Sequence, residues 1–165
     1  RIVLMGGAYT NGNVTPAAEF NIIADADAAY VCFTAGRPIT MIGLDVTRKA
    51  LCYPSIVDRM EKIGNKASKL FVDLMRHFCK SQKEVFGWEG GPLHDPITIA
   101  WLIDPSVVET KPMHAEIDIR SVQSYGRTNC DFFGYQKLEP NADVGIGIDA
   151  DKFWDMVEEV LRMYD

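Results

Sequence analysis

The sequence lacks an apolar run long enough to cross a bilayer, and it lacks any cluster of lysine and arginine residues. A membrane-spanning helix needs about 20 consecutive, mostly apolar residues. Affinity for nucleic acid depends largely on clustered basic side chains, whereas the formal net charge here is -6 at pH 7. We therefore expect neither a membrane nor a nucleic acid as a partner.

Metal-binding cysteine motifs and a signal peptide are also absent. Four cysteines stand singly along the chain: Cys32, Cys52, Cys79 and Cys130. None forms a CxxC pair or lies at metal-binding spacing from a histidine. We expect four buried thiols in a reducing compartment, which predicts a cytoplasmic protein. The apolar run after Arg1 is too short for a signal peptide, and the absence of an initiator Met is typical of a truncated chain.

The length and composition are those of an ordinary globular domain. The chain has 165 residues, of which 47% are hydrophobic and 24% charged. A chain of this size can bury one sizeable core without disulfides or metals. We therefore predict a single domain over residues 1–165.

The first third of the chain alternates between apolar runs and turn residues. Residues 1–8 form a short apolar run that ends in two glycines, which is typical of a buried parallel strand. Thr15, with Pro16 after it, predicts the start of a helix that continues to about residue 35 and is interrupted near residues 25–27. Residues 39–46 form a second β-rich run. Strand, helix and strand in this order predict an α/β fold, a Rossmann-like, mainly parallel sheet flanked by helices.

The remaining elements fit the same fold. An amphipathic stretch over residues 54–80, weakly broken at Gly64, predicts a pair of helices. Residues 97–103 predict a short apolar helix, and Asp149 is expected to cap a final helix. Three further strands are expected over residues 113–119, 126–133 and 143–148.

One cluster of polar residues follows the first predicted strand. It contains Asn13, Glu19 and Asn21, whose carboxylate and amide groups can accept from and donate to sugar hydroxyls. In parallel sheets the carboxyl ends of strands are where ligands bind. Helix capping or exposure to solvent explains the same residues, although the spacing from Thr15 to Glu19 is one residue too long for a capping box. The residues alone leave both interpretations open.

A second cluster consists of His94 and Asp95 before Pro96. A carboxylate binds hard cations, and a histidine transfers protons near neutral pH. Asp before Pro is also a common helix start, so Asp95 is equally explained as a cap.

Together, four stretches resemble the inosine–uridine-preferring nucleoside hydrolases: LMGGA at residues 4–8, GNVTPAAEFN at 12–21, GLDVT at 43–47 and HDP at 94–96. The resemblance implies the C-terminal half of that fold. It also implies hydrolysis of the N-glycosidic bond of ribonucleosides to ribose and free base by a water activated on calcium.

The resemblance implies roles for particular residues. The implied substrate-binding residues are Met5, Asn13, Glu19, Phe20, Asn21 and Asp95. Asp95 is also the implied calcium ligand, and His94 is the implied catalytic residue that protonates the departing base. A place in the core explains Phe20 equally well. The presence of His94 favours inosine, uridine and cytidine as substrates.

The chain departs from the family in one respect. The aspartate-rich DTDPGxDDA run, which supplies most calcium ligands, is absent. We therefore expect a C-terminal fragment that alone neither binds calcium tightly nor hydrolyses nucleosides. Its first strand should expose an apolar edge, which predicts a missing partner segment or a homo-oligomer. The alternative function is a non-catalytic α/β ribose-binding or interaction module.

A loop containing Phe86 and Trp88 allows two interpretations. Gly87, Gly90 and Gly91 are possible hinges, so the two aromatic residues can belong to a mobile lid over the base. Packing of both rings on the neighbouring helix is the other interpretation.

Overall fold

The computed structural model describes residues 1–164, which divide into two units. The sheet unit consists of Arg1–Thr47 and His94–Ile148, and the helical unit consists of Arg48–Leu93 and the C-terminal segment from Asp149. The single domain over residues 1–165, whose last residue lies outside the described range, stays a prediction.

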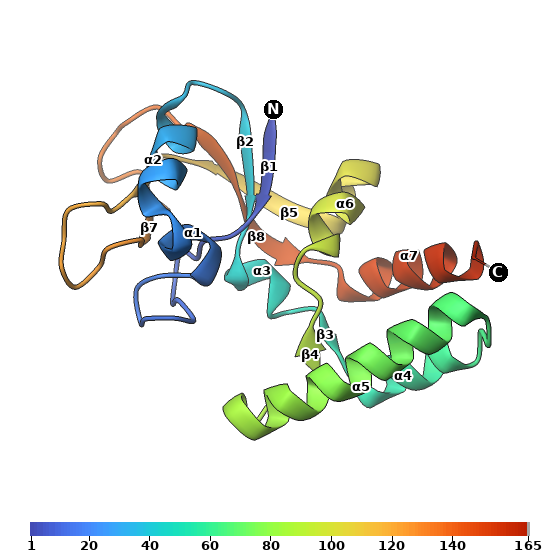
Figure 1. Ribbon diagram of the computed structural model, residues 1–165. Coiled ribbons are helices and arrows are strands. Elements are labelled where there is room, and N and C mark those ends of the chain that lie inside the picture. The colour runs from blue at the N-terminus through green and yellow to red at the C-terminus, as the bar shows by residue number, and fades with distance from the viewer. Residues whose placement is uncertain (165) are drawn as a thin grey trace. The chain divides into compact units, whose positions relative to one another are not determined.

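The sheet unit is built on four strands that lie side by side (Figure 1). In spatial order they are β1 (Ile2–Met5), β2 (Ile39–Ile42), β8 (Ala142–Ile148) and β5 (Val108–Met113). The pairs β1–β2 and β2–β8 are parallel, and β5 is antiparallel to β8. All four residues of β2 are buried, as expected for a parallel strand with neighbours on both sides. The mainly parallel α/β sheet is therefore confirmed.

Strand β1 lies at one edge of this sheet. Its residues are only half-buried, and within residues 1–164 it pairs with β2 alone. The prediction of an apolar open edge agrees with this arrangement. Assembly into a homo-oligomer through that edge stays a prediction.

The helix predicted from Thr15 starts later than expected. Helix α1 covers Phe20–Ala24 and α2 covers Ala26–Thr34, so the predicted interruption near residues 25–27 is confirmed. The predicted start at Thr15 is wrong, because the Thr15 hydroxyl accepts hydrogen bonds from the amides of Ala17 and Ala18 in a local turn. Such turns compete with helix formation.

The second predicted strand is correct only up to Ile42. After it the chain forms the short helix α3 (Leu44–Thr47), which contacts β8. The amides of Val46 and Thr47 both donate to the carbonyl of Gly43. These local bonds replace the sheet pairing that was expected because the β-rich run continues to residue 46.

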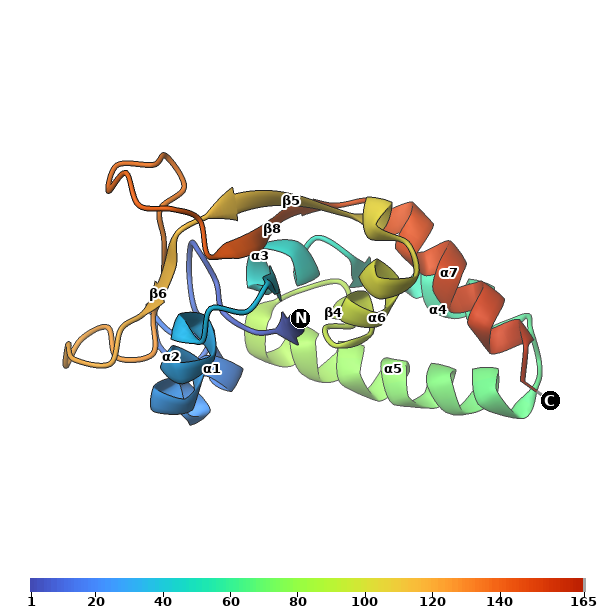
Figure 2. The ribbon, with the colours of Figure 1, turned by 90° about the horizontal axis from the view of Figure 1, so that it is seen from above.

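Helix α6 (Pro96–Ile103) matches the predicted short apolar helix and contacts β1. The 3-10 turn η1 (Pro105–Val107) follows it and leads into β5. Strand β5 continues into β6 (Ala115–Ile117), as Figure 2 shows. Strand β6 pairs with β7 (Thr128–Cys130) as a separate antiparallel ribbon. The predicted strand over residues 113–119 therefore divides between β5 and β6.

The core of the sheet unit gathers side chains from helices, sheet and ribbon. Its buried members are Ile22, Ala26, Phe33, Ile39, Met41, Met113, Ala115, Ile117, Ala142 and Val144. Because α1, α2 and the strands share this core, the loop between β1 and α1 has two fixed ends.

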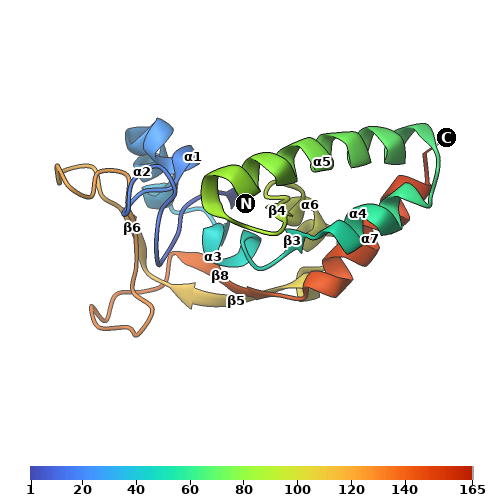
Figure 3. The same ribbon diagram turned by 90° about the horizontal axis from the view of Figure 1, so that it is seen from below.

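The helical unit contains α4 (Pro54–Glu61), α5 (Lys66–Phe86) and α7 (Ala150–Arg162), as Figure 3 shows. The predicted helix pair is confirmed, and so is the cap by Asp149, whose carboxylate accepts from the amide of Lys152 at 3.0 Å. A two-stranded pair, β3 (Leu51–Cys52) and β4 (Gly91–Pro92), completes the unit.

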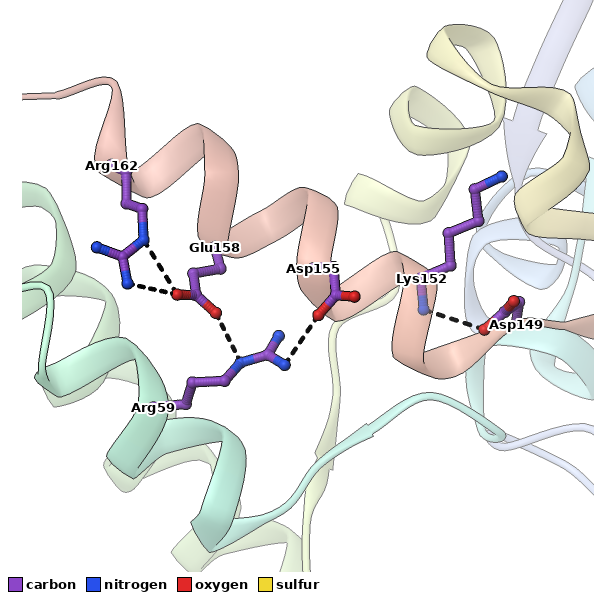
Figure 4. A network of polar contacts seen from close by, with 6 residues as sticks. All are labelled: Arg59, Asp149, Lys152, Asp155, Glu158 and Arg162. Atoms are coloured by element: carbon purple, nitrogen blue, oxygen red, sulfur yellow. Dashed lines mark hydrogen bonds and ion pairs between the residues drawn. The ribbon is translucent and has the colours of Figure 1, made fainter.

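A polar network joins α4 to α7 (Figure 4). The guanidinium of Arg59 contacts Asp155 and Glu158, each at 2.9 Å. The two acids are three residues apart and therefore share one face of α7. Arg162 holds Glu158 from the next turn at 2.6 Å. Each of these partly exposed ion pairs contributes little to stability.

Within residues 1–164, no helix is long and apolar enough to cross a membrane. All four cysteines are free thiols. Cys52 is buried, and burial raises the pKa of its thiol to about 12. The expectation of four buried thiols holds for Cys52 alone. Cys79 and Cys130 are half-buried, and Cys32 is exposed on helix α2. A cytoplasmic location stays a prediction.

Candidate functional site

Both predicted clusters lie in the sheet unit, and the first gathers at the end of β1. Gly7 adopts a φ of 77°, a conformation that suits glycine. A Cβ atom there would lie 2.7 Å from the hydroxyl of Thr128. This turn directs the Gly7 amide at Glu19, whose Oε2 accepts from it at 2.9 Å.

Glu19 is the N-cap of α1 and is only 2% exposed. Its Oε1 accepts from the amide of Asn21 at 2.8 Å, and its Oε2 also accepts from Ile22 at 3.3 Å. The capping interpretation is therefore correct for Glu19. A carboxylate has about four acceptor positions, so one position remains for a ligand, on Oε1.

The other residues of this cluster surround the start of α1. The side-chain amide of Asn21 donates to the carbonyl of Met5 at 3.2 Å, and Asn13 accepts from the amide of Phe20 at 2.9 Å. Within residues 1–164, Oδ1 of Asn21 and Nδ2 of Asn13 make no hydrogen bond, so one acceptor and one donor remain. The core interpretation of Phe20 is wrong, because its side chain is 60% exposed.

Asp45, on α3, is a further residue of this site that sequence reasoning missed. Its carboxylate accepts from the amide of Tyr9 at 2.7 Å and from the hydroxyl of Thr10. These bonds hold the loop that leads from β1 to Asn13. Asp45 belongs to the GLDVT stretch of the resemblance, but the spacing of the sequence does not indicate which residue its carboxylate contacts.

The second cluster begins α6. The Nδ1 atom of the half-buried His94 lies 2.7 Å from the hydroxyl of Thr47. Asp95 is exposed and precedes α6 without any side-chain capping bond. Its carboxylate makes no hydrogen bond or ion pair with any residue that the structure describes. The capping interpretation is therefore wrong for Asp95, and its carboxylate is available to a ligand.

A run of hydrogen bonds connects the two clusters. The amide of Gly7 binds Glu19, and the carbonyl of Gly7 accepts from the amide of Leu44 at 2.9 Å. Leu44 begins α3, and Thr47 at the end of α3 holds His94. The clusters are thus joined through α3, and not by a direct hydrogen bond between described residues.

Calcium does not fit the residues of this chain alone. Among residues 1–164, no group of three or more histidine, cysteine, aspartate or glutamate side chains is placed to hold a metal. Calcium takes about six to eight oxygen ligands. Asp95 offers one free carboxylate, so the described residues by themselves contain no complete calcium site.

Phe86 and Trp88 belong to the helical unit. Their rings stack with centroids 5.0 Å apart, and the guanidinium of Arg48 lies 5.7 Å from the Trp88 ring. Gly90 and Gly91 are buried, which is unlike a surface hinge. These contacts favour packing within the unit, and the lid stays a prediction.

Comparisons with known proteins point to one family. The sequence profile described as inosine-uridine preferring nucleoside hydrolase matches residues 1–155. Two curated relatives named pyrimidine-specific ribonucleoside hydrolase RihB, from Shigella flexneri serotype 5b (strain 8401) and Escherichia coli O17:K52:H18 (strain UMN026 / ExPEC), are each 50% identical over 163 residues. The alignments cover 99% of this chain and 52% of each relative.

A solved structure of a purine-preferring ribonucleoside hydrolase from Gardnerella vaginalis is 32% identical, with a TM-score of 0.85. The match covers 97% of this chain and 52% of that chain. The chain thus spans about half the length of the relatives that it matches.

Proposed function

Because the chain belongs to the inosine-uridine preferring nucleoside hydrolase family, we propose that its sheet unit forms one side of the active site of a ribonucleoside hydrolase. The reaction is the cleavage of the N-glycosidic bond by water, which releases ribose and the free base. The relatives at 50% identity are named pyrimidine-specific, so uridine and cytidine are the first substrates to test, followed by inosine.

The first cluster is suited to hold the ribose. Nδ2 of Asn13 donates, whereas Oδ1 of Asn21 and the remaining position on Glu19 accept, which matches the needs of neighbouring hydroxyls. The transition state for breaking an N-ribosidic bond has oxocarbenium character. Fixed hydroxyls and a carboxylate beside the ring favour the positive charge that develops there.

The second cluster is suited to act on the bond that breaks. We assign to His94 the activation of the departing base through a proton on its ring, an effect of about a hundredfold or more in such reactions. The free carboxylate of Asp95 can accept from a ribose hydroxyl and supply one oxygen to a cation. The other ligands for calcium would have to come from outside the described residues.

One observation supports the proposal most strongly. Two stretches that are about 70 residues apart in sequence, around Glu19 and His94, are tied to the same short helix by hydrogen bonds. Independent helix caps would not require this connection.

A non-catalytic ribose-binding module remains the second candidate. This candidate is favoured by the hydrogen bonds of Glu19, whose carboxylate accepts from three backbone amides and so has a structural role. In that case sugar binding would persist without turnover.

The test measures ribose released from uridine, cytidine and inosine by the full-length product of the gene. Asp95→Ala should lower kcat/KM at least about a hundredfold with an unchanged Tm. Asp104→Ala is the matched control at the other end of α6, because the Asp104 carboxylate caps η1 through Ser106. This control should lower the Tm and keep the turnover. Sugar binding without any ribose release in the parent protein would support the binding module instead.

A further inference from the structure

The contact between Thr47 and His94 bears on which nitrogen of the imidazole ring carries the proton. Thr47 is completely buried at the end of α3, and its Oγ1 lies 2.7 Å from Nδ1 of His94. Either atom can be the donor, depending on where the ring carries its proton. The surroundings of the hydroxyl decide between the two arrangements.

A buried hydroxyl proton needs an acceptor, because leaving it unsatisfied costs about 1–3 kcal/mol. Threonine in a helix often donates to a carbonyl of the preceding turn. Within the described part of the chain, Nδ1 of His94 is the hydrogen-bond partner of the Thr47 hydroxyl, and no such carbonyl bond is formed. The hydroxyl therefore donates to Nδ1, which must then carry no proton.

We propose that Thr47 is a positioning residue, which holds neutral His94 in the single tautomer that has its proton on Nε2. Nε2 lies on the side of the ring away from Nδ1, so the ring proton lies where Thr47 does not reach. This inference rests on the proposed function, in which that proton meets an acceptor atom of the departing base. Helix α3 then contributes two residues to the site: Asp45 holds the loop before Asn13, and Thr47 holds the His94 ring.

The alternative is a ring that exchanges between both neutral tautomers. Without the hydroxyl, the hydrogen bond at Nδ1 that favours one of them is lost. Some of the rings would then present a lone pair where the base needs a donor. Fixing the tautomer is one way in which residues behind a histidine set its chemistry.

Ring-nitrogen NMR of the 165-residue chain with isotope-labelled histidine tests this directly. The chain has three histidines, so His77→Gln and His114→Gln assign the signals. The spectra are recorded at about pH 9, well above the usual pKa of a histidine side chain. We expect the shift of an unprotonated nitrogen at Nδ1 of His94 and that of a protonated nitrogen at Nε2.

Three variants separate positioning from general stability. Thr47→Val removes the hydroxyl at nearly constant shape and should give averaged shifts for both nitrogens, whereas Thr47→Ser should restore the parent pattern. Thr40→Val is the matched control, because Thr40 is also buried, at 1% exposure, but lies within β2. It should leave the His94 signals unchanged.

A protonated Nδ1 in the parent chain would overturn the proposal, as would an unchanged pattern in Thr47→Val. If Thr47→Val does not fold, as its amide spectrum would reveal, the parent and Thr47→Ser spectra still decide the tautomer. The measurement involves no nucleoside, cation or turnover. A failed tautomer test and a failed hydrolysis assay are therefore separate results.

Discussion

Two carboxylates, Glu19 and Asp95, each precede a helix of the sheet unit, but the structure uses them in opposite ways. Glu19 is buried and accepts from three backbone amides, whereas Asp95 is exposed and caps nothing. Burial of a charge is tolerated only where hydrogen bonds compensate for lost water. Glu19 therefore builds the site, and Asp95 is left for a ligand.

Backbone conformation explains the difference. Glu19 has φ -86° and ψ 147°, an extended geometry from which a side chain folds back onto the first amides of the helix. Asp95 has φ -64° and ψ -41°, which is already helical, and its side chain makes no capping bond. The amides of Ile97 and Thr98, which a cap would have bound, donate instead to the carbonyls of His94 and Asp95.

Other loop acids of the sheet unit resemble Glu19. Asp25 accepts from the amide of Ala28, and Asp131 accepts from those of Tyr135 and Gln136. Each of these carboxylates stabilises its own turn. Asp95 therefore differs from them in having no backbone amide to hold.

The largest expected effect is the difference in stability between two alanine variants. Glu19→Ala leaves three amides without an acceptor and should lower the free energy of unfolding by at least about 3 kcal/mol. Asp95→Ala should change it by less than about 0.5 kcal/mol. Urea denaturation followed by circular dichroism measures both. Equal losses would contradict the contrast between the two carboxylates.

A smaller effect is expected for a capping acid in acid solution. Hydrogen bonds from Ser124 and from the amides of Ser121 and Arg120 lower the pKa of Asp118 from its usual 3.8, against a small opposing effect of burial. A lowered pKa contributes stability above the unfolded value, and this is lost as the pH falls through the folded value. Asp118→Asn should therefore flatten the decline of stability below about pH 4.

Asp95→Asn is the control for that experiment, because it removes a carboxylate that holds no amide. Its stability at neutral pH should match that of the parent chain. A decline in Asp118→Asn as steep as in the parent would mean that the Asp118 bonds do not contribute.

The smallest expected effect concerns calcium. In the proposed site Asp95 would provide one ligand, and the described residues contain no metal-binding group around it. Calorimetric titration of the 165-residue chain should therefore give no heat of binding at micromolar calcium. Micromolar affinity would show that Asp95 has partners that this account does not include.

The sequence predicted the elements whose patterns are local. The run before Gly6, the helix pair over residues 54–80 and the cap at Asp149 depend on periodicity and capping chemistry within a few residues. Strand β5 was missed between Val108 and Pro112, because its pattern is largely polar and its pairing with β8 is long-range. Proline is tolerated there since β5 is an edge strand.

The sequence indicated which residues belong to the candidate site, but not which contacts they make. For both Glu19 and Asp95 the sequence allowed a helix cap or a ligand-binding carboxylate. Only the backbone angles distinguish the two. The contacts of Asp45 with Tyr9 and of Thr47 with His94 span 36 and 47 residues. Such contacts depend on the parallel pairing of β1 with β2, which no local pattern contains.

The central claim is that both clusters hold the same nucleoside. Its most direct test is an NMR titration of uridine into the full-length product of the gene, with signals followed at Asn21 and at His94. The account predicts that both sets of signals shift along one binding curve with one Kd. Saturation by uridine with shifts at only one of the two residues would contradict it.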